Sequence, residues 1–162
     1  MKENGKWFSL YYDGTPDLFN SKPPLMIWFQ VIFIQILGYH ELSIRLPSAI
    51  AAALTLIFVF RFVYRQLKKE WAWLSFLILL TSVGFINFHS ARTGDSDSLL
   101  TLFLWLANVY FFKYIYENKN HSVFFFWLFI LLAFITKLYA SLFFFFPGIF
   151  LLVYDIGKYG IL

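Results

Sequence analysis

The sequence predicts an all-α membrane protein with about five transmembrane helices and one interfacial or re-entrant helix. Of its 162 residues, 60% are hydrophobic and only 14% are charged, whereas soluble domains are about 45–50% apolar and about 25% charged. The mean hydropathy is +0.69, and the charges cluster between long charge-free stretches. A soluble fold of this length could not bury so much apolar surface, so the lipid bilayer is the expected solvent.

The composition also excludes several classes of partner and site. The net charge of +4 is modest, and no basic stripe alternates with stacking residues, so we expect no nucleic-acid partner. The chain has no cysteine, which excludes disulfides and thiolate metal sites. The polar, charged residues 1–22 predict a loop rather than a cleavable signal peptide.

The charge-free stretches predict five membrane spans, at residues 46–65, 71–91, 97–116, 121–138 and 140–156. A helix rises about 1.5 Å per residue, so the second stretch can cross about 30 Å of hydrocarbon. The first and third reach this length if Arg61, Arg65 and Lys113 extend their charged ends to the interface. All five belong to a single transmembrane domain, 1–162.

The loop charges predict the orientation of these spans. Residues 61–69 contain four basic residues in nine, and loops rich in Lys and Arg stay in the cytoplasm. Alternation then places residues 1–22, 89–98 and 137–139 on the outer side of the membrane.

The segment at 23–38 has two possible placements. Its apolar core, 25–37, contains Gln30 and Gln35, and apolar runs of about 10–14 residues are more often interfacial than spanning. We therefore expect a helix that lies in or dips into the outer face, with a tilted span as the alternative. Two prolines, Pro23 and Pro24, suit its first turn, where no N–H partner is needed.

Three polar clusters are predicted to meet on the outer side, at residues 13–24, 41–47 and 92–98, with Lys137 as a fourth element. Asp95 and Asp97 precede a predicted helix, so either could simply cap it. Alternatively, a carboxylate held at the membrane edge acts as a base or a metal ligand, because such acids are costly there.

Three further groups also have alternative interpretations. Glu41 and Arg45 stand four residues apart, as in a helical ion pair, although the planar Arg45 guanidinium also suits a phosphate. Lys22 is either an interfacial anchor or a ligand of a lipid phosphate. His40 and His89 are expected at the interface rather than on a metal.

Four motifs in this chain resemble one family of enzymes: SKPPLMIWFQ at 21–30, GYHELSIRLPSAIAAALT at 38–55, ARTGDSDSLLTLF at 91–103 and ITKLYASLFFFFPG at 135–148. In this order they resemble the N-terminal part of GT-C membrane glycosyltransferases related to protein O-mannosyltransferases and to the lipid A aminoarabinose transferase. The resemblance covers residues 6–154 and implies a GT-C-like partial fold.

The resemblance implies transfer of a sugar from a polyprenyl-phosphate donor to a lipid, protein or glycan acceptor. The active face would be the extracytoplasmic face of a bacterial inner membrane, among membrane lipids. Direct displacement at the anomeric carbon needs a carboxylate to take the acceptor proton and cations to stabilise the departing phosphate. A divalent metal is neither required nor excluded, and we assign no metal ligands.

By this resemblance, Lys22 faces the carrier phosphate, and Asp97, with Asp95 beside it, is the acid of the second outer loop. Arg45 and Arg92 are candidate phosphate or structural partners.

Lys137 matches the lysine of a Lys-Gly pair, in which Leu138 replaces the glycine. This replacement puts a tight backbone approach at that point in question.

The family's leading catalytic acids, an Asp followed by Glu, would lie before Met1. We therefore expect this chain to be a fragment, inactive in isolation. Two alternatives stay open: a non-catalytic membrane protein, such as a degenerate paralogue or assembly partner, and a piece of a transporter. Transporters place their charges near the membrane midplane, whereas here the charges gather at span ends.

Overall fold

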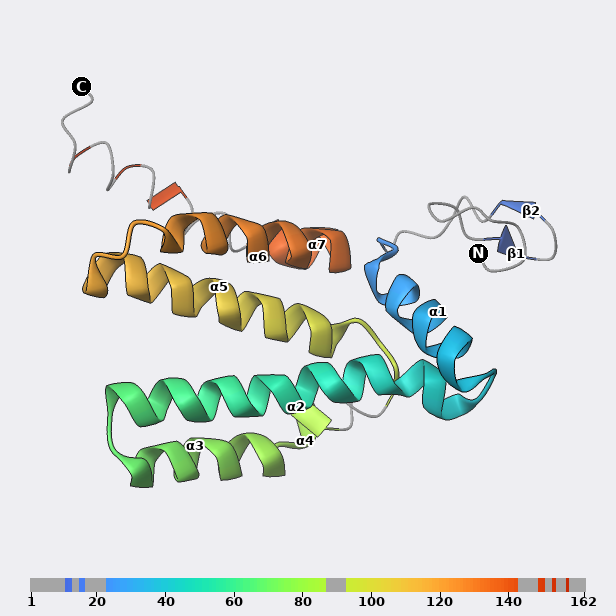
Figure 1. Cartoon of the computed structure of the whole chain (residues 1–162), viewed down its shortest axis with the longest axis horizontal. Coiled ribbons are helices and arrows are strands. Elements are labelled where there is room, and N and C mark those ends of the chain that lie inside the picture. The colour runs from blue at the N-terminus through green and yellow to red at the C-terminus, as the bar shows by residue number, and fades with distance from the viewer. Residues whose placement is uncertain are drawn as a thin grey trace.

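A computed structural model describes residues 11–12, 15–16, 23–86, 93–142, 149–150, 153 and 157. The described chain is a bundle of helices (Figure 1), which confirms the predicted all-α class. The helices are α1 (Leu25–Leu37), α2 (Glu41–Gln66), α3 (Lys69–Thr81), α4 (Val83–Ile86), α5 (Asp97–Glu117), α6 (Ser122–Thr136) and α7 (Leu138–Leu142). A two-residue antiparallel pair, β1 (Tyr11–Tyr12) with β2 (Thr15–Pro16), precedes them.

The helices form one layer in the order α3, α2, α5 and α6, with α1 crossing the start of α2 (Figure 1). Two ends of this layer carry polar groups. We call one the junction end, where residues 23–30, 38–45, 93–98 and 136–138 lie. We call the other the basic end, where α2 and α5 carry Arg61, Arg65 and Lys113 near their last turns and Lys119 follows α5.

The core is concentrated where α1, α2, α5 and α6 meet near the junction end. Its buried members are Leu25, Met26, Ala51, Leu99, Leu100, Leu102, Phe103 and Ala133. Alanines on α2 and α6 carry little side-chain bulk, so they let neighbouring helices approach closely, as is common between membrane helices. A second cluster, around Tyr114 and Phe126, continues the α5–α6 seam toward the basic end.

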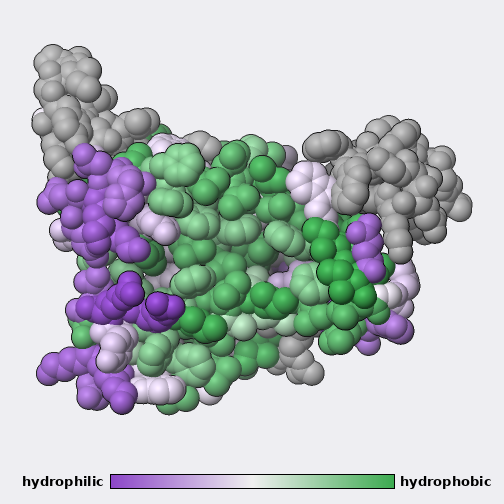
Figure 2. All heavy atoms as spheres, viewed as in Figure 1, coloured by the Kyte–Doolittle hydropathy of each residue, from purple (hydrophilic) through white to green (hydrophobic). Residues whose placement is uncertain are grey.

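The outside of the bundle is apolar across its middle. Figure 2 shows hydrophobic side chains over the centre of the visible face and hydrophilic ones gathered at the basic end. Large apolar side chains such as Ile57, Leu77 and Leu131 are exposed. A water-soluble protein rarely exposes so large a continuous apolar surface, whereas a bilayer would cover it.

Two of the predicted spans correspond to long helices. By length and composition, α2 and α5 can each cross a membrane, whereas α1 and α6 are apolar but shorter. The first span, predicted at 46–65, lies within α2, which begins earlier, at Glu41. The third, predicted at 97–116, agrees with α5 to within one residue. The number of membrane crossings stays a prediction.

The helix expected over 71–91 is interrupted at Ser82, which was not predicted. The backbone of Ser82 is extended, and the chain resumes as the short helix α4. The preceding Thr81 hydroxyl donates to the Leu77 carbonyl at 2.8 Å, and Gly84 follows two residues later. A hydroxyl that donates to a carbonyl one turn earlier weakens a helix, and so does glycine. The helix is therefore easily interrupted at this point.

The remaining predicted segments are described in part. The helix α6 spans most of 121–138, and α1 covers the whole apolar core predicted at 25–37. Of the two prolines, Pro24 is the N-cap of α1, so both stand just before the helix rather than inside its first turn. The span predicted at 140–156 begins within α7, and most of it lies outside the described residues.

Candidate functional site

An ion pair between Asp97 and Lys137 is the central contact of the junction end. The Lys137 ammonium Nζ lies 2.7 Å from Asp97 Oδ1. The two side chains are 36% and 41% exposed, so water or a ligand can reach both of them. The pair joins residues 40 positions apart and places an acid and a cation in direct contact.

Helix termini position both members of this pair. Asp97 is the first residue of α5, and Lys137 is the extended residue between α6 and α7. The Lys137 N–H donates to the Ala133 carbonyl at 2.9 Å, and its carbonyl accepts from Ser141 N–H at 3.3 Å. The backbone of Lys137 is therefore fixed from both sides, which limits where its ammonium can reach.

The two acids at the start of α5 make different contacts. The N-cap of α5 is Ser96, and it makes no side-chain capping hydrogen bond. Asp95 Oδ1 accepts the Ser96 N–H at 2.7 Å, which holds the turn before the helix. Asp97 instead contacts Lys137, so its carboxylate serves a tertiary contact.

Gln30 connects α1 to the turn that carries the acids. Its amide Nε2 donates to the Gly94 carbonyl at 2.8 Å and to the Ile44 carbonyl at 3.3 Å. Gly94 has a φ of 72°, and a Cβ atom there would lie 3.0 Å from the Ile44 carbonyl oxygen. Only glycine fits this close approach without strain, so the 93–98 turn is packed directly against the start of α2.

The predicted helical pair at the start of α2 is confirmed. The Arg45 guanidinium contacts the Glu41 carboxylate, and both side chains are well exposed. The buried Ser43 hydroxyl between them in sequence donates to the Gly38 carbonyl at 2.8 Å. Arg45 therefore lies at the junction end, directly after Ile44, whose carbonyl Gln30 contacts.

Two hollows open beside these residues. A hollow of about 180 Å³ is lined by Pro23, Gln30, Gly94, Asp95 and Ser96, with apolar side chains of α1. An apolar groove of about 270 Å³ runs between α1, α2 and α5. Its walls include Phe29, Phe33, Ile50, Leu54, Leu102 and Phe103.

The other predicted site residues have different outcomes. Lys22 and Arg92 lie outside the described residues, so their positions stay predictions. His40 is the N-cap residue of α2, and His89 is outside the described residues. Among the described residues, no three His, Asp or Glu side chains are grouped closely enough to hold a metal ion.

Sequence reasoning missed Gln30 and Gly94 as parts of the site. Gln30 was noted only as a polar interruption of an apolar run. A glutamine at such a position signals a polar contact, because an amide in hydrocarbon must find hydrogen-bond partners. Its partners could not be predicted, since they lie 14 and 64 residues away.

The arrangement places an acid directly against a cation, close to an apolar groove. A carboxylate can accept a proton, and an adjacent ammonium can bind an anion. The apolar groove is lined in part by Leu99, two residues after Asp97.

Comparison with known proteins bears out the resemblance. The model of the family described as dolichyl-phosphate-mannose-protein mannosyltransferase matches residues 21–159. Two Bacillus subtilis (strain 168) proteins are also similar. They are "Putative mannosyltransferase YycA", at 27% identity over 113 residues, and "Putative mannosyltransferase YkcB", at 29% identity over 120 residues. They cover 70% and 74% of this chain, which spans 16% of each of them.

A solved structure has the same fold. The crystal structure of ArnT from Cupriavidus metallidurans bound to undecaprenyl phosphate matches 95% of this chain with a TM-score of 0.78. The sequence identity is 19%, and the match covers 28% of that chain. The likeness confirms the GT-C-like partial fold.

Proposed function

Because the chain belongs to the dolichyl-phosphate-mannose-protein mannosyltransferase family, we propose that it acts in glycosyl transfer from a polyprenyl-phosphate-linked sugar to an acceptor on the extracytoplasmic face. The observation that carries the proposal is the 2.7 Å contact between Asp97 and Lys137. It provides a carboxylate and a cation at one place beside an apolar groove. The bound lipid of the ArnT structure, undecaprenyl phosphate, belongs to the same class as the proposed donor.

The proposed reaction is a direct displacement. An acceptor hydroxyl attacks the anomeric carbon of the sugar, and its proton passes to a carboxylate, for which Asp97 and Asp95 are the candidates. The bond from the anomeric carbon to the phosphate oxygen breaks, and the electron pair stays on the polyprenyl phosphate. Lys137 stabilises this growing negative charge, and Lys22, Arg45 and Arg92 are the further candidate phosphate ligands.

The Asp97–Lys137 contact has a specific consequence for binding. In the resting state the Asp97 carboxylate neutralises the ammonium that the phosphate needs. Replacing Asp97 with Asn would leave Lys137 available, so the lipid phosphate should bind as tightly as before or more tightly. Loss of transfer with lipid binding unchanged is the result expected when the substituted group acts in the transition state.

The apolar groove between α1, α2 and α5 is the proposed path of the isoprenoid tail. Its walls are almost wholly apolar, and Ile50, which lines it, is 41% exposed. A tail in the groove would leave its phosphate near the polar residues of the junction end. Burying each methylene in apolar surroundings contributes about 0.8 kcal/mol, so even a short contact adds affinity.

The test measures lipid binding and transfer separately. The chain is placed in phosphatidylcholine nanodiscs with undecaprenyl phosphate, and the retained lipid is counted by native mass spectrometry. Lys137→Met should lower retention about tenfold, because a cation is removed and Asp97 is left uncompensated. Asp97→Asn should keep retention or raise it.

A matched pair of variants tests the groove. Ile50→Trp fills the groove and should reduce retention severalfold. Ile57→Trp adds the same bulk to a similarly exposed position of α2 outside the groove and should not change retention. If Lys137→Met and Ile50→Trp both retain the lipid like the unaltered chain, the proposed donor site is wrong.

Transfer is measured in membranes of the natural host, with a labelled sugar on polyprenyl phosphate. Asp97→Asn, made in the natural protein, should reduce transfer to the acceptor by about 10²–10⁴-fold. Unchanged transfer would instead favour the alternative of a non-catalytic membrane protein.

A further inference from the structure

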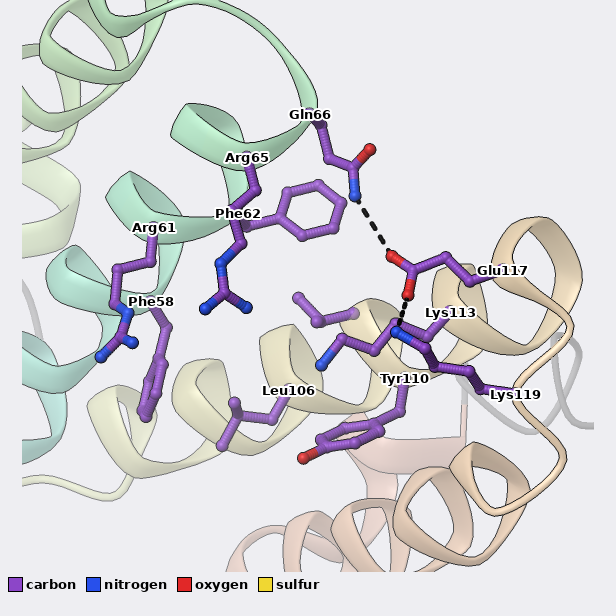
Figure 3. Close-up of a pocket in the computed structure, with 11 residues that line it drawn as sticks. Phe58, Arg61, Phe62, Arg65, Gln66, Leu106, Tyr110, Lys113, Glu117 and Lys119 are labelled. Atoms are coloured by element: carbon purple, nitrogen blue, oxygen red, sulfur yellow. Dashed lines mark hydrogen bonds and ion pairs between the residues drawn. The ribbon is translucent and has the colours of Figure 1, made fainter.

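We propose that the basic end contains a binding site for the phosphate headgroup of an anionic phospholipid, separate from the donor site. A cavity opens there, between α2 and α5 (Figure 3). Its volume is about 490 Å³, within the range of about 300–1,000 Å³ usual for ligand sites. The proposal does not depend on glycosyl transfer, because it rests on residues at the opposite end of the bundle.

Cations line this cavity from two helices. In Figure 3, Arg61 and Arg65 project from α2 toward α5, which contributes Lys113. Their spacing follows from the helix, since residues four apart lie on one face. A phosphate between the helices would therefore meet donors from both sides.

The acid in this cavity is already engaged. Glu117 accepts from the Lys119 ammonium and, at 3.4 Å, from the Gln66 amide. Within the described part of the chain, neither Arg61 nor Arg65 has an ion pair. Like charges that face one cavity repel each other, and a bound anion would relieve this repulsion.

Aromatic side chains give the cavity an apolar floor and hold one of its cations in place. Lys113 Nζ lies 4.6 Å from the centre of the Tyr110 ring, a cation–π contact. That ring is itself stacked on Phe125 of α6, with centroids 4.9 Å apart. Phe58 and Phe62 complete the wall from α2.

The mixture of donors and apolar surface matches a lipid better than a soluble anion. A phospholipid can place its phosphate among the guanidinium groups while its glycerol and upper acyl carbons contact Phe58 and Phe62. Basic pockets between membrane helices on the cytoplasmic side bind anionic headgroups in this way, and the positive loop at 61–69 predicts that side here.

The experiment compares two double variants that remove the same charge. In Arg61→Gln/Arg65→Gln the cavity loses its arginines. In Lys68→Gln/Lys69→Gln two cations are lost from the adjoining turn, outside the cavity lining. Each chain is placed in nanodiscs of phosphatidylcholine that contain about 20% phosphatidylglycerol. Native mass spectrometry then measures which lipid is retained.

The unaltered chain should retain phosphatidylglycerol in preference to phosphatidylcholine by about tenfold. The arginine double variant should lose most of this preference, whereas the lysine double variant should keep it. Equal losses in the two variants would show only a diffuse surface charge and would overturn the site. Absence of any preference in the unaltered chain would overturn it as well, whether or not the variants fold.

Two further arms identify the ligand chemistry. Arg61→Lys/Arg65→Lys keeps the charges but removes the planar donor fork, and it should weaken the preference by a smaller factor than the glutamine variant. Inorganic phosphate, added at millimolar concentration, should not displace the retained phosphatidylglycerol. Displacement by inorganic phosphate would overturn the lipid as the natural occupant and identify a soluble phosphate instead.

Discussion

The two polar ends of the bundle differ in how their charges are arranged. At the junction end, the Asp97–Lys137 pair brings opposite charges together from distant parts of the chain. At the basic end, Arg61, Arg65 and Lys113 surround an open cavity, and the acid there, Glu117, is held by Lys119. A pair of opposite charges suits a site where charge develops and shifts during a reaction. An excess of positive side chains suits the binding of a negatively charged ligand.

The ends also differ in how their backbones are held. The junction end contains a tertiary network in which Gln30 contacts two carbonyls and Gly94 packs against Ile44. At the basic end the cations stand on regular turns of α2 and α5. We infer that the junction end depends on exact backbone placement and the basic end mainly on charge. Four substitutions test this comparison, in order of decreasing expected effect.

The largest effect is expected at Asp97. Asp97→Asn, introduced into the natural protein, should reduce sugar transfer by about 10²–10⁴-fold, the usual contribution of a general base. The measurement is initial-rate transfer from a labelled polyprenyl-phosphate sugar. Arg61→Gln, at the other end, is the comparison, and a similar fall in that variant would mean that the ends are not functionally distinct.

The second prediction concerns Gly94 as the rigid point of the junction end. Gly94→Ala should lower the stability by about 2 kcal/mol, because alanine is strained at positive φ and its Cβ would lie 3.0 Å from the Ile44 oxygen. Thermal unfolding in detergent measures the change. The control is Gly84→Ala, where a Cβ meets nothing within 4 Å, and an equal loss there would remove the special role of Gly94.

A smaller loss is expected at Gln30. Gln30→Leu removes the hydrogen bonds to Gly94 and Ile44 and should destabilise the chain by about 1 kcal/mol, a typical net contribution. The matched control, Gln35→Leu, lies on the exposed side of the same helix. Both are compared by the unfolding midpoint, and no difference between them would contradict the proposed link between α1 and the 93–98 turn.

The smallest effect is expected for the exposed pair at the start of α2. Glu41→Gln should change stability by at most about 0.5 kcal/mol, since exposed helical ion pairs contribute little, and the change should shrink further in high salt. Chemical unfolding at two salt concentrations measures this. A loss above about 2 kcal/mol would place Glu41 in the rigid network of the junction end, contrary to its exposure.

Several parts of this fold could be predicted from the sequence because they depend on local composition. The apolar runs identified α1, α2 and α5, and the four-residue spacing identified the Glu41–Arg45 pair. The break at Ser82 was missed, because hydrophobicity alone does not report weak helix formers inside an apolar stretch.

The site was only partly predictable for a different reason. Motif resemblance selected Asp97 and Lys137 separately, but their direct contact depends on how α5 and α6 pack. From the sequence, the basic residues at 61–69 predicted only the orientation of the chain. The cavity itself could not be predicted, because Arg61 and Lys113 lie in separate segments of the sequence. Contacts between residues 40 or more positions apart follow from the tertiary fold and leave no local pattern.

The central claim is that the two ends bind different phosphate lipids. The most direct test is a crossed retention measurement in nanodiscs that contain both undecaprenyl phosphate and phosphatidylglycerol, read by native mass spectrometry. Lys137→Met should lose the polyprenyl lipid and keep phosphatidylglycerol, and Arg61→Gln/Arg65→Gln should do the reverse. If both variants lose both lipids to the same extent, the two ends do not act as separate sites and the claim is wrong.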